Sequence, residues 1–466
     1  MSKKLILIAL LIGCLPAYAS AMVAEGWVRH DIGPQTSPIY LDVADIDGDG
    51  NPDVAATADV HPNGSNSEVA WYRNNLKKGL PWEKVVISSD KPDTDPIVGA
   101  GGIVIADIDG DGRKDAVVVT GNVLKPKGDV YWFKAPADPA TSPWQRFDIE
   151  TGVADSYFKV YTMDADGDGT QDIVIGGNKG AVLFLNPGHP DQPGAAWTKV
   201  PLPEGTGSTV CLDDMNNDGR IDIINTHTGF KPDYTGNVSW LDVKNDSGQV
   251  TFDRTMIDPA LVRAFDANTM DVNGDGRKDV VVSTFQLPYI YWYEQPAAST
   301  APWIQHLITD TYEGTDLYTG DIDGDGKTDL IVSGLFKNKI YWFSYQLKNG
   351  AAVWTDHLLD DDIINPGDIS LNDMDGDGDL DVVVAGMGEN QIIWYENQLP
   401  RANPCALTFV LGEKSSALPA LRSFRDSYLK SMPGGESIIK SYYSASPGIV
   451  EFLKSIKGVT TKLLPW

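Results

Sequence analysis

The sequence predicts an all-β fold, a seven-bladed β-propeller followed by a small α-helical segment. Two observations lead to this prediction. An acidic nine-residue loop with the pattern D-x-[DN]-x-D-G-x-x-D occurs seven times, and the copies begin 50 to 62 residues apart. Four strand-like segments accompany the copies, and a repeat of this length with four strands per unit is typical of a propeller blade and not of a solenoid turn.

The four strands of a unit are predicted in a fixed order. A short segment such as residues 39–45 ends in the first Asp of the loop, and a β-branched run such as residues 279–282 follows the loop. The third strand is aromatic, as in residues 130–133. The fourth opens on an aromatic residue and approaches the pattern W-x-x-H-x-I; its copies start at Trp27, Trp82, Trp144, Trp197, Phe252, Trp303 and Trp354.

The order of the strands also predicts how the ring closes. The first aromatic-opening strand, residues 27–32, precedes the first loop, whereas the last unit ends after Tyr395 without such a strand. The N-terminal strand is therefore expected to complete the seventh blade. That arrangement removes the open sheet edge that a linear array would leave.

The loops have the composition of a metal site. Positions 1, 3, 5 and 9 are Asp or Asn in every copy, and position 6 is always Gly, which adopts the positive φ of a tight turn freely. Position 4 is Gly six times and Asn217 once. So many oxygen side chains in nine residues suit a hard divalent cation, and calcium above all, because it accepts six to eight oxygen ligands in flexible geometry.

A helix–loop–helix calcium hand is not predicted. That motif needs a bidentate Glu at position 12, and none of the seven copies has one: the residues there are Ala56, Val118, Ile175, Asn225, Val282, Val332 and Val384. Seven acidic turns without metal are the alternative. It is disfavoured because clustered carboxylates without a counter-charge repel one another.

The predicted cofactor is therefore Ca²⁺, up to seven ions with a structural role. Position 7 varies from copy to copy, which suits a main-chain carbonyl ligand. The predicted ligands are, in loop 1, Asp45, Asp47, Asp49, Asn51 and Asp53; in loop 2, Asp107, Asp109, Asp111, Arg113 and Asp115; in loop 3, Asp164, Asp166, Asp168, Thr170 and Asp172; in loop 4, Asp214, Asn216, Asp218, Arg220 and Asp222; in loop 5, Asp271, Asn273, Asp275, Arg277 and Asp279; in loop 6, Asp321, Asp323, Asp325, Lys327 and Asp329; and in loop 7, Asp373, Asp375, Asp377, Asp379 and Asp381.

The net charge limits the kinds of partner, and the first residues indicate the location. The chain carries a formal charge of −28, which argues against nucleic-acid binding because that function needs a basic footprint. Residues 1–19 are predicted to be an export signal, with Lys3 and Lys4, an apolar run and an A-x-A cleavage site. A bacterial lipoprotein signal acylated at Cys14 is the alternative. Both place the protein outside the cytoplasm, in the periplasm, at the cell surface or beyond it.

The remaining cysteines do not predict a disulfide framework. After cleavage they are Cys211, which is expected to be a small buried residue of a first strand, and Cys405.

The period ends after residue 397. Residues 398–404 are predicted to be a linker and residues 405–466 a helical region, too short in its apolar runs to cross a membrane. Residues 421–429, Tyr442, Tyr443, Ser446 and Pro447 resemble the CFI-box region of exported bacterial proteins. The resemblance implies sorting or surface attachment; a helical cap packed on the propeller is the alternative.

Residues 27–397 resemble the FG-GAP/VCBS-type repeat proteins, whose best-known members form the seven-bladed head of integrin α chains. The seven acidic loops carry the resemblance, and residues 332–334 and 384–386 are remnants of the other family signatures. The resemblance implies calcium-binding blades.

The first functional hypothesis is a non-catalytic binding or adhesion module for an extracellular protein or glycan. If calcium loops join first and second strands, the longer loops lie on the opposite face, and such loops on a rigid scaffold are where function usually lies. They are residues 58–68 with His61; 155–158; 226–236 with His227, Phe230 and Tyr234; 261–265 with Arg263; 311–314 with Tyr312; and 335–337. Membrane contact is expected only through a lipid anchor at Cys14 or through C-terminal attachment.

Two alternatives stay open. One is a carbohydrate-active enzyme of the polysaccharide lyase or sugar dehydratase type, which needs a general base. His30, His306 and His357 belong to the repeating strand pattern and are expected to be structural, which leaves His61, His189 and His227. No nucleophile elbow, metalloprotease helix or phosphate loop occurs. The other alternative is a purely structural part of a surface assembly.

Overall fold

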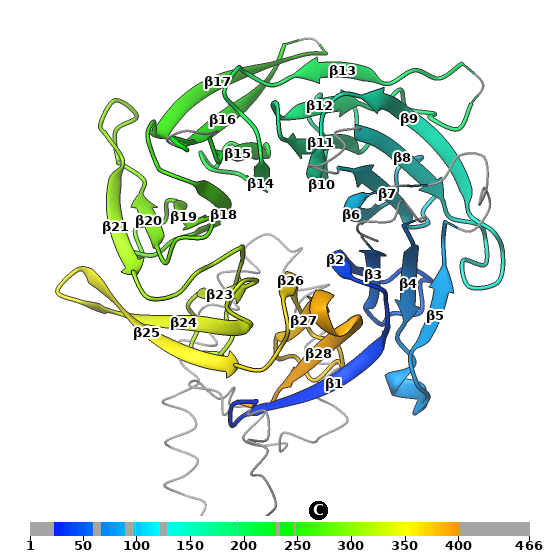
Figure 1. The fold of residues 1–466 in the computed structure, drawn as a ribbon. Helices are drawn as coiled ribbons and strands as arrows, with labels where there is room; N and C mark the ends of the chain where they lie inside the picture. The colour runs from blue at the N-terminus through cyan, green and yellow to red at the C-terminus, as the bar shows by residue number, and fades with distance from the viewer. Residues whose placement is uncertain are drawn as a thin grey trace, which may run out of the picture.

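The chain from Trp27 to Asn397 forms a closed ring of seven four-stranded antiparallel sheets in the computed structural model (Figure 1). The structure describes residues 23–58, 67–88, 97, 99–121, 128–192, 194–229, 234–246 and 248–399. The predicted export signal, most of the linker and the helical region 405–466 lie outside the described residues, as do Cys14, His61, Phe230 and Cys405. The all-β propeller and its count of seven blades are confirmed.

Each of the first six blades consists of four strands in chain order. Blade 1 is β2 (Pro38–Ala44), β3 (Asp53–Ala58), β4 (Val69–Arg73) and β5 (Glu83–Val86), with the short helix η1 (Leu76–Lys78) before β5. Blade 2 is β6 (Ala100–Ala106), β7 (Asp115–Thr120), β8 (Gly128–Lys134) and β9 (Gln145–Val153). Blade 3 is β10 (Tyr157–Met163), β11 (Asp172–Gly177), β12 (Val182–Leu185) and β13 (Thr198–Pro201).

The same order continues around the ring. Blade 4 is β14 (Thr209–Asp213), β15 (Asp222–His227), β16 (Asn237–Asp246) and β17 (Gln249–Asp258). Blade 5 is β18 (Ala264–Met270), β19 (Asp279–Thr284), β20 (Ile290–Glu294) and β21 (Ile304–Thr309). Blade 6 is β22 (Asp316–Gly320), β23 (Asp329–Gly334), β24 (Lys339–Lys348) and β25 (Ala351–Asp360).

The two ends of the ring meet in blade 7, as the strand order predicts. Its sheet contains β26 (Pro366–Asn372), β27 (Asp381–Gly386), β28 (Gln391–Asn397) and, as the outer strand, β1 (Trp27–Pro34), with the short helix η2 (Met387–Glu389) before β28. β1 pairs with β28 from Trp27 opposite Asn397 to Pro34 opposite Gln391. Because this sheet holds both ends of the ring, the chain closes by hydrogen bonds between segments far apart in sequence.

The core lies between neighbouring blades and not at the centre of the ring. The second strands β3, β7, β11, β19, β23 and β27 are buried along their whole length, which explains their continuous β-branched sequences. Between blades 1 and 2, for example, Trp71 of β4 belongs to the same buried cluster as Val118 of β7 and Tyr131 of β8. Seven such clusters form around the described ring.

The recurring histidines of the fourth strands have a packing role. His30, His306 and His357 each stack on the tryptophan of the neighbouring third strand, with ring centroids 3.9–4.4 Å apart. In blade 2 the same cross-strand position is filled by Phe147, which stacks on Trp132. In these four blades, the residue at this position of the fourth strand therefore supplies an aromatic ring that covers the tryptophan of the third strand.

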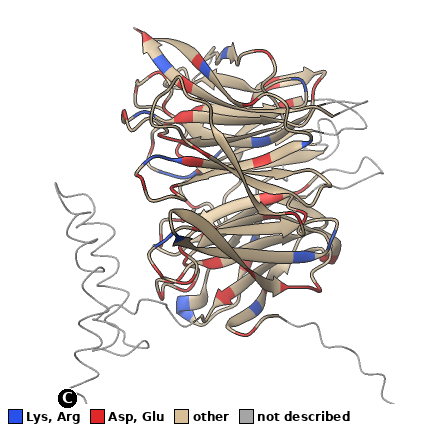
Figure 2. Ribbon diagram, turned by 90° about the vertical axis from the view of Figure 1, so that its left-hand side faces the viewer, with Lys and Arg blue, Asp and Glu red and all other residues tan. Residues whose placement is uncertain are grey.

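Within the described chain, neither helical element has the length and apolar character needed to cross a bilayer. Seen from the side, the ring carries acidic and basic residues close to one another on its strands and loops (Figure 2).

Candidate metal sites and binding face

Each acidic loop joins the first strand of its blade to the second, so all seven lie on one face of the ring. The backbone has the conformation that the glycines predict: the position 6 glycines have φ of 82–93°, and position 4 has φ of 58° at Asn217 and 70–81° at the six glycines. This is the left-handed region, which glycine adopts without strain and asparagine tolerates. The confirmed turn brings the acidic side chains of one loop together.

Backbone hydrogen bonds fix one oxygen of most carboxylates in the loops. In all seven loops the N–H of position 5 donates to the position 3 side chain and the N–H of position 7 donates to the position 5 carboxylate, at 2.8–3.2 Å. In six loops the position 6 N–H donates to the position 1 carboxylate. The loops therefore hold their carboxylates in place through the main chain.

The position 9 aspartates are almost completely buried at the base of the loops. Asp53, for example, accepts from the N–H of Ile46 in its own loop at 3.0 Å and from the N–H of Asn74 at 2.7 Å. The bond from position 2 recurs in all seven loops, at 2.8–3.2 Å. In blade 1, position 9 therefore ties the loop to the segment that follows the third strand, β4.

Three acidic groups approach within 4.8 Å of one another in five of the loops. The groups are Asp45, Asp47 and Asp53; Asp107, Asp109 and Asp115; Asp164, Asp166 and Asp172; Asp321, Asp323 and Asp325; and Asp373, Asp375 and Asp381. Loops 4 and 5 have Asn216 and Asn273 at position 3, so an amide oxygen takes the place of one carboxylate there. The acidic clusters could hold metal ions.

Two buried carboxylate oxygens indicate whether a cation would fit in the acidic loops. Among the described residues, Asp45 Oδ1 and Asp321 Oδ1 have no hydrogen-bond partner, although the second oxygen of each carboxylate accepts from a glycine N–H. A buried carboxylate oxygen without a partner is costly. The ligand set is all oxygen and pre-arranged, so the residues fit a hard cation.

The position 7 side chains have a role that the sequence did not suggest. In six loops this side chain contacts the position 5 carboxylate: Asn51 with Asp49, Arg113 with Asp111, Thr170 with Asp168, Arg220 with Asp218, Arg277 with Asp275, and Lys327 with Asp325. In loop 7 position 7 is Asp379, so this loop carries five carboxylates and no basic side chain. Four of the loops thus supply an internal cation, and loop 7 does not.

Burial shifts the titration of the position 9 carboxyls. Burial, followed by repulsion from the neighbouring loop carboxylates, raises the pKa of Asp329 to about 8. Burial likewise raises the pKa of Asp381 to about 8, that of Asp53, Asp115 and Asp279 to about 7, and that of Asp172 and Asp222 to about 6, although backbone hydrogen bonds oppose the shift. Burial therefore disfavours the charged form of the position 9 carboxyls in these loops.

On the opposite face, Arg263 joins the loops of blades 4 and 5. Its guanidinium lies over the Tyr234 ring at 4.2 Å and donates to Gln286 Oε1 at 2.8 Å, and its backbone N–H donates to the Tyr234 carbonyl at 3.0 Å. The structure therefore brings together Tyr234 and Arg263, which belong to two of the loops predicted to lie on this face. Tyr234, Arg263 and Gln286 all have φ of 53–58°, which is unusual for residues with side chains.

A row of phenylalanines continues from this point towards blade 6. The ring centroids of Phe265 and Phe285 are 4.9 Å apart, and those of Phe285 and Phe336 are 5.6 Å apart. Phe336 is 47% exposed. Phe285 and Gln286 were missed in the sequence because they follow an ordinary second strand; the antiparallel pairing of β18 with β19, which sets Ala264 opposite Thr284, places them beside Arg263.

The two candidate catalytic histidines that the structure describes do not come together. His227 ends β15 on the face of Arg263, whereas His189 lies in the connection between β12 and β13, on the face of the acidic loops. Burial lowers the pKa of His227, with a smaller contribution from Arg254. The third candidate, His61, is outside the described residues.

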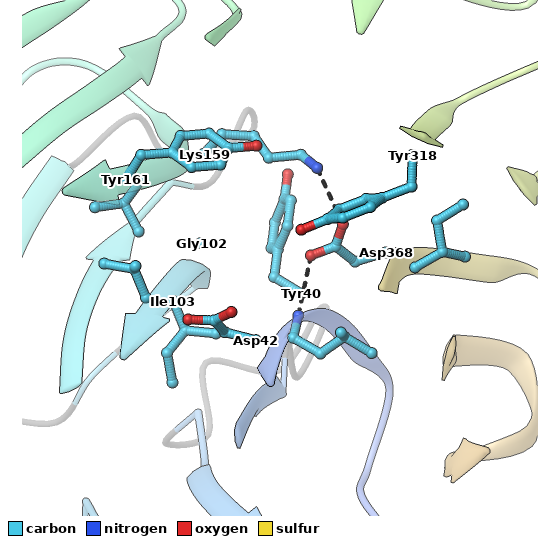
Figure 3. Close-up of a pocket in the computed structure, with 12 residues that line it drawn as sticks. Tyr40, Asp42, Gly102, Ile103, Lys159, Tyr161, Tyr318 and Asp368 are labelled. Carbon is cyan, nitrogen blue, oxygen red and sulfur yellow. Dashed lines mark hydrogen bonds and ion pairs between the residues drawn. The ribbon is translucent and has the colours of Figure 1, made fainter. Parts of the chain in front are cut away.

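The axis of the ring holds a polar cluster that the sequence analysis also missed. Lys159 of β10 lies 2.6 Å from Asp316 of β22 and 3.0 Å from Asp368 of β26. Figure 3 shows Tyr40, Tyr161 and Tyr318 around Lys159 and Asp368, which line a cavity of about 50 Å³, space for a few waters. In the sequence, the polar residues of this cluster are either three or five positions before the first Asp of the loop in their own blade. Polar residues at alternate positions of the first strands could have indicated that one side of these strands faces a polar axis.

The axial aspartates also connect neighbouring blades. Asp316 Oδ2 accepts from the N–H of Ile369 in blade 7, and Asp368 Oδ2 accepts from the N–H of Leu41 in blade 1, at 3.0 and 3.1 Å. Burial and then the Asp368 carboxylate raise the pKa of Asp316, whereas Lys159 overcomes the effect of burial and holds the pKa of Asp368 below its usual value. The Asp316 and Asp368 side chains thus hold Lys159 and the backbone of the next blade at once.

Comparison with solved structures gives distant likenesses. A structure described as showing recognition of non-reducing terminal N-acetylglucosamine by an Agrocybe aegerita lectin matches with a TM-score of 0.44 and 16% identity, over 70% of this chain and 81% of the other. BBS1N in complex with ARL6DN matches with a TM-score of 0.45 and 11% identity, over 82% and 99%. A Bacillus licheniformis rhamnogalacturonan lyase matches with a TM-score of 0.44 and 13% identity, over 81% and 73%. No curated protein matches the chain.

A family model described as an FG-GAP-like repeat matches four segments, residues 45–118, 107–175, 164–225 and 271–332. Each matched segment starts at the first Asp of one acidic loop and ends in the strand that follows the next acidic loop. Together the segments cover more than half of the chain. The chain belongs to the family of FG-GAP-like repeat proteins.

Proposed function

We propose that this protein is an exported calcium-binding propeller that acts as a non-catalytic binding or adhesion module for an extracellular protein or glycan. Calcium in the acidic loops stabilises the ring, and the face opposite those loops binds the partner. The export signal predicted for residues 1–19 supports a location outside the cytoplasm, where calcium is plentiful.

The observation that carries the proposal is the contact set around Arg263. A guanidinium stacked on Tyr234 lies beside the row of Phe265, Phe285 and Phe336. Arginine and aromatic side chains dominate the energetics of binding surfaces, and aromatic rings with a fixed cation suit both peptide and sugar ligands. Tyr234, Arg263 and Gln286 hold the left-handed backbone conformation, and such backbone strain gathers at functional sites.

Calcium is proposed from the chemistry of the loops. Their candidate ligands are all oxygen, Asp45 Oδ1 and Asp321 Oδ1 are buried and find no hydrogen-bond partner in the part of the chain that the structure describes, and the sites repeat around a ring. A catalytic metal keeps an open position and usually has histidine ligands, so the role proposed for these ions is structural.

A binding screen tests the function. The protein, with calcium bound and after chelation, is passed over arrays of glycans and of envelope proteins. The variants Arg263→Ala and Phe336→Ala are expected to lose at least about tenfold in affinity for the ligand found, since a residue at the centre of an interface contributes 2 kcal/mol or more, and to keep the thermal midpoint of the parent.

A matched control comes from blade 2. Arg146 stacks on Tyr131 at 3.9 Å on the outer strands, away from the proposed face, so Arg146→Ala removes a comparable cation–π contact. It should leave binding unchanged. If Arg263→Ala and Phe336→Ala also leave binding unchanged, the ligand does not bind at this face.

A further inference from the structure

One asparagine in each of three blades makes the same set of hydrogen bonds to two metal loops. Asn74 and Asn186 directly follow the third strands β4 and β12, and Asn397 is the last residue of the third strand β28. Their backbone N–H groups donate to the position 9 carboxylates of their own blades, Asp53, Asp172 and Asp381, at 2.7–2.8 Å.

The side-chain amides reach in two directions. In its own loop, each donates to the carbonyl of position 8: Pro52, Gln171 and Leu380, at 3.0 Å. In the loop of the preceding blade, each donates to the carbonyl of position 2: Met374, Ile108 and Ile322, at 2.8–2.9 Å. The amide thus uses both of its donors on two different metal loops.

The position 2 residue completes the connection. Its own N–H donates to the position 9 carboxylate of its loop, as Met374 does to Asp381 at 2.8 Å. A continuous path of hydrogen bonds therefore runs from Asp381 of loop 7 through Met374 and Asn74 to Asp53 of loop 1. Each asparagine is at most 5% exposed, and its amide oxygen accepts from the N–H two residues on.

The connections are not uniform around the ring. Asn397 joins loops 6 and 7, Asn74 joins loops 7 and 1, and Asn186 joins loops 2 and 3. In blade 5, Gln295 makes the inter-blade bond to Met215 at 3.1 Å. The equivalent residue in blade 2 is Ala135, whose backbone bonds to Asp115 and whose side chain has no donor. Loops 6, 7 and 1 thus form one linked group across the point of ring closure.

We propose that Asn74, Asn186 and Asn397 are positioning residues that couple cation binding between adjacent loops. An ion in loop 7 holds Asp381 and Met374 in place, which fixes the acceptor for Asn74 and so orders Asp53 in loop 1. The coupling rests on the proposed role of calcium in these loops. Filling one of the linked loops then strengthens binding in the next, and the contact of Asn74 with Met374 also joins the first and last blades of the ring.

Native mass spectrometry of the calcium-loaded protein tests the coupling by counting bound ions. The count is taken at a free calcium concentration near the midpoint of loading, in the parent and in Asp45→Ala, which disables loop 1. Coupled loops predict that Asp45→Ala loses more than one ion, because loops 6 and 7 also weaken. In the Asn74→Ala background the same change should cost one ion, because the link to loop 7 is gone.

The control is Asn225→Ala. Asn225 is fully buried and makes three hydrogen bonds to Gly207 and Thr209 on the opposite face, so its loss removes a comparable amide without touching a metal loop. In that background Asp45→Ala should still cost more than one ion. Should Asn74→Ala fail to fold, Asn186→Ala with Asp107→Ala repeats the comparison at loops 2 and 3.

The possible results separate the two proposals. A loss of one ion in every background overturns the coupling and leaves the calcium role intact. A parent protein that binds no calcium overturns the structural role of calcium, and the coupling with it.

Discussion

The ammonium of Lys159 on β10 lies 2.6 Å from an Asp316 carboxylate oxygen on β22 and 3.0 Å from Asp368 on β26, across the axis of the ring. Lys159 comes from blade 3 and its two partners from blades 6 and 7. These side chains are 7–12% exposed, so the contact joins blades that are distant around the ring through a buried ion pair.

Lys159→Met is expected to destabilise the propeller by about 3–5 kcal/mol, because removal of one partner leaves buried carboxylates without compensation. Denaturant unfolding in saturating calcium measures the loss. The double variant Lys159→Met/Asp316→Asn should recover part of it, since one of the carboxylates is then neutral. A loss below about 1 kcal/mol, the usual value of an exposed ion pair, would contradict a structural role for this contact.

Calcium removal is expected to lower the thermal midpoint strongly. A site that binds only the folded state adds about 2.7 kcal/mol when the ion is present at 100 times its Kd, and several such sites act on one ring. Calorimetry before and after chelation measures the change, and added calcium should restore the midpoint where magnesium does not. An identical midpoint in both conditions would show that the loops fold without a cation.

The loops are expected to differ in affinity according to their own charges. In loop 5, Arg277 pairs with the Asp275 carboxylate, whereas loop 7 has Asp379 at that position. Arg277→Thr should strengthen calcium binding at loop 5 by about two- to fivefold, the equivalent of an exposed ion pair of up to about 1 kcal/mol. Asp379→Arg should weaken loop 7. Calcium titration of both variants measures whether the affinity rises at loop 5 and falls at loop 7. Loop 3 already has Thr170 at the position changed in Arg277→Thr.

Stability below neutral pH is expected to depend on His357. Burial lowers its pKa, although Asp323 and Asp356 oppose the shift. The unfolded chain therefore takes up a proton at His357 near pH 6.5, while the folded chain does not. The stability that comes from keeping His357 neutral is fully present above pH 6.5, and it is lost as the pH falls from there towards the folded pKa of His357.

His357→Phe tests this contribution. Blade 2 already uses Phe147 on Trp132 at the equivalent position, so stacking on Trp342 should survive. Thermal midpoints in saturating calcium should fall less between pH 7.5 and pH 5.5 in the variant than in the parent. Equal falls would assign the acid sensitivity to other groups.

The sequence by itself determined the blades. The loop pattern gives a local turn, and the β-branched and aromatic runs give strands whose order is fixed by short connections, so β3 and β4 could be predicted from residues that are neighbours in the chain. Closure by β1 also followed from the sequence, because the last blade lacked a fourth strand. The glycines of the loops predicted their own backbone conformation.

The tertiary structure decided what lies between blades. Asn74 bonds to Met374, 300 residues away, and Lys159 meets Asp316 and Asp368 only because a ring returns on itself. Phe285 and Phe336 meet because blades 5 and 6 pack side by side. A repeat pattern records what each unit does locally, whereas contacts at the axis and at the blade junctions depend on the curvature of the closed ring, which no single unit encodes.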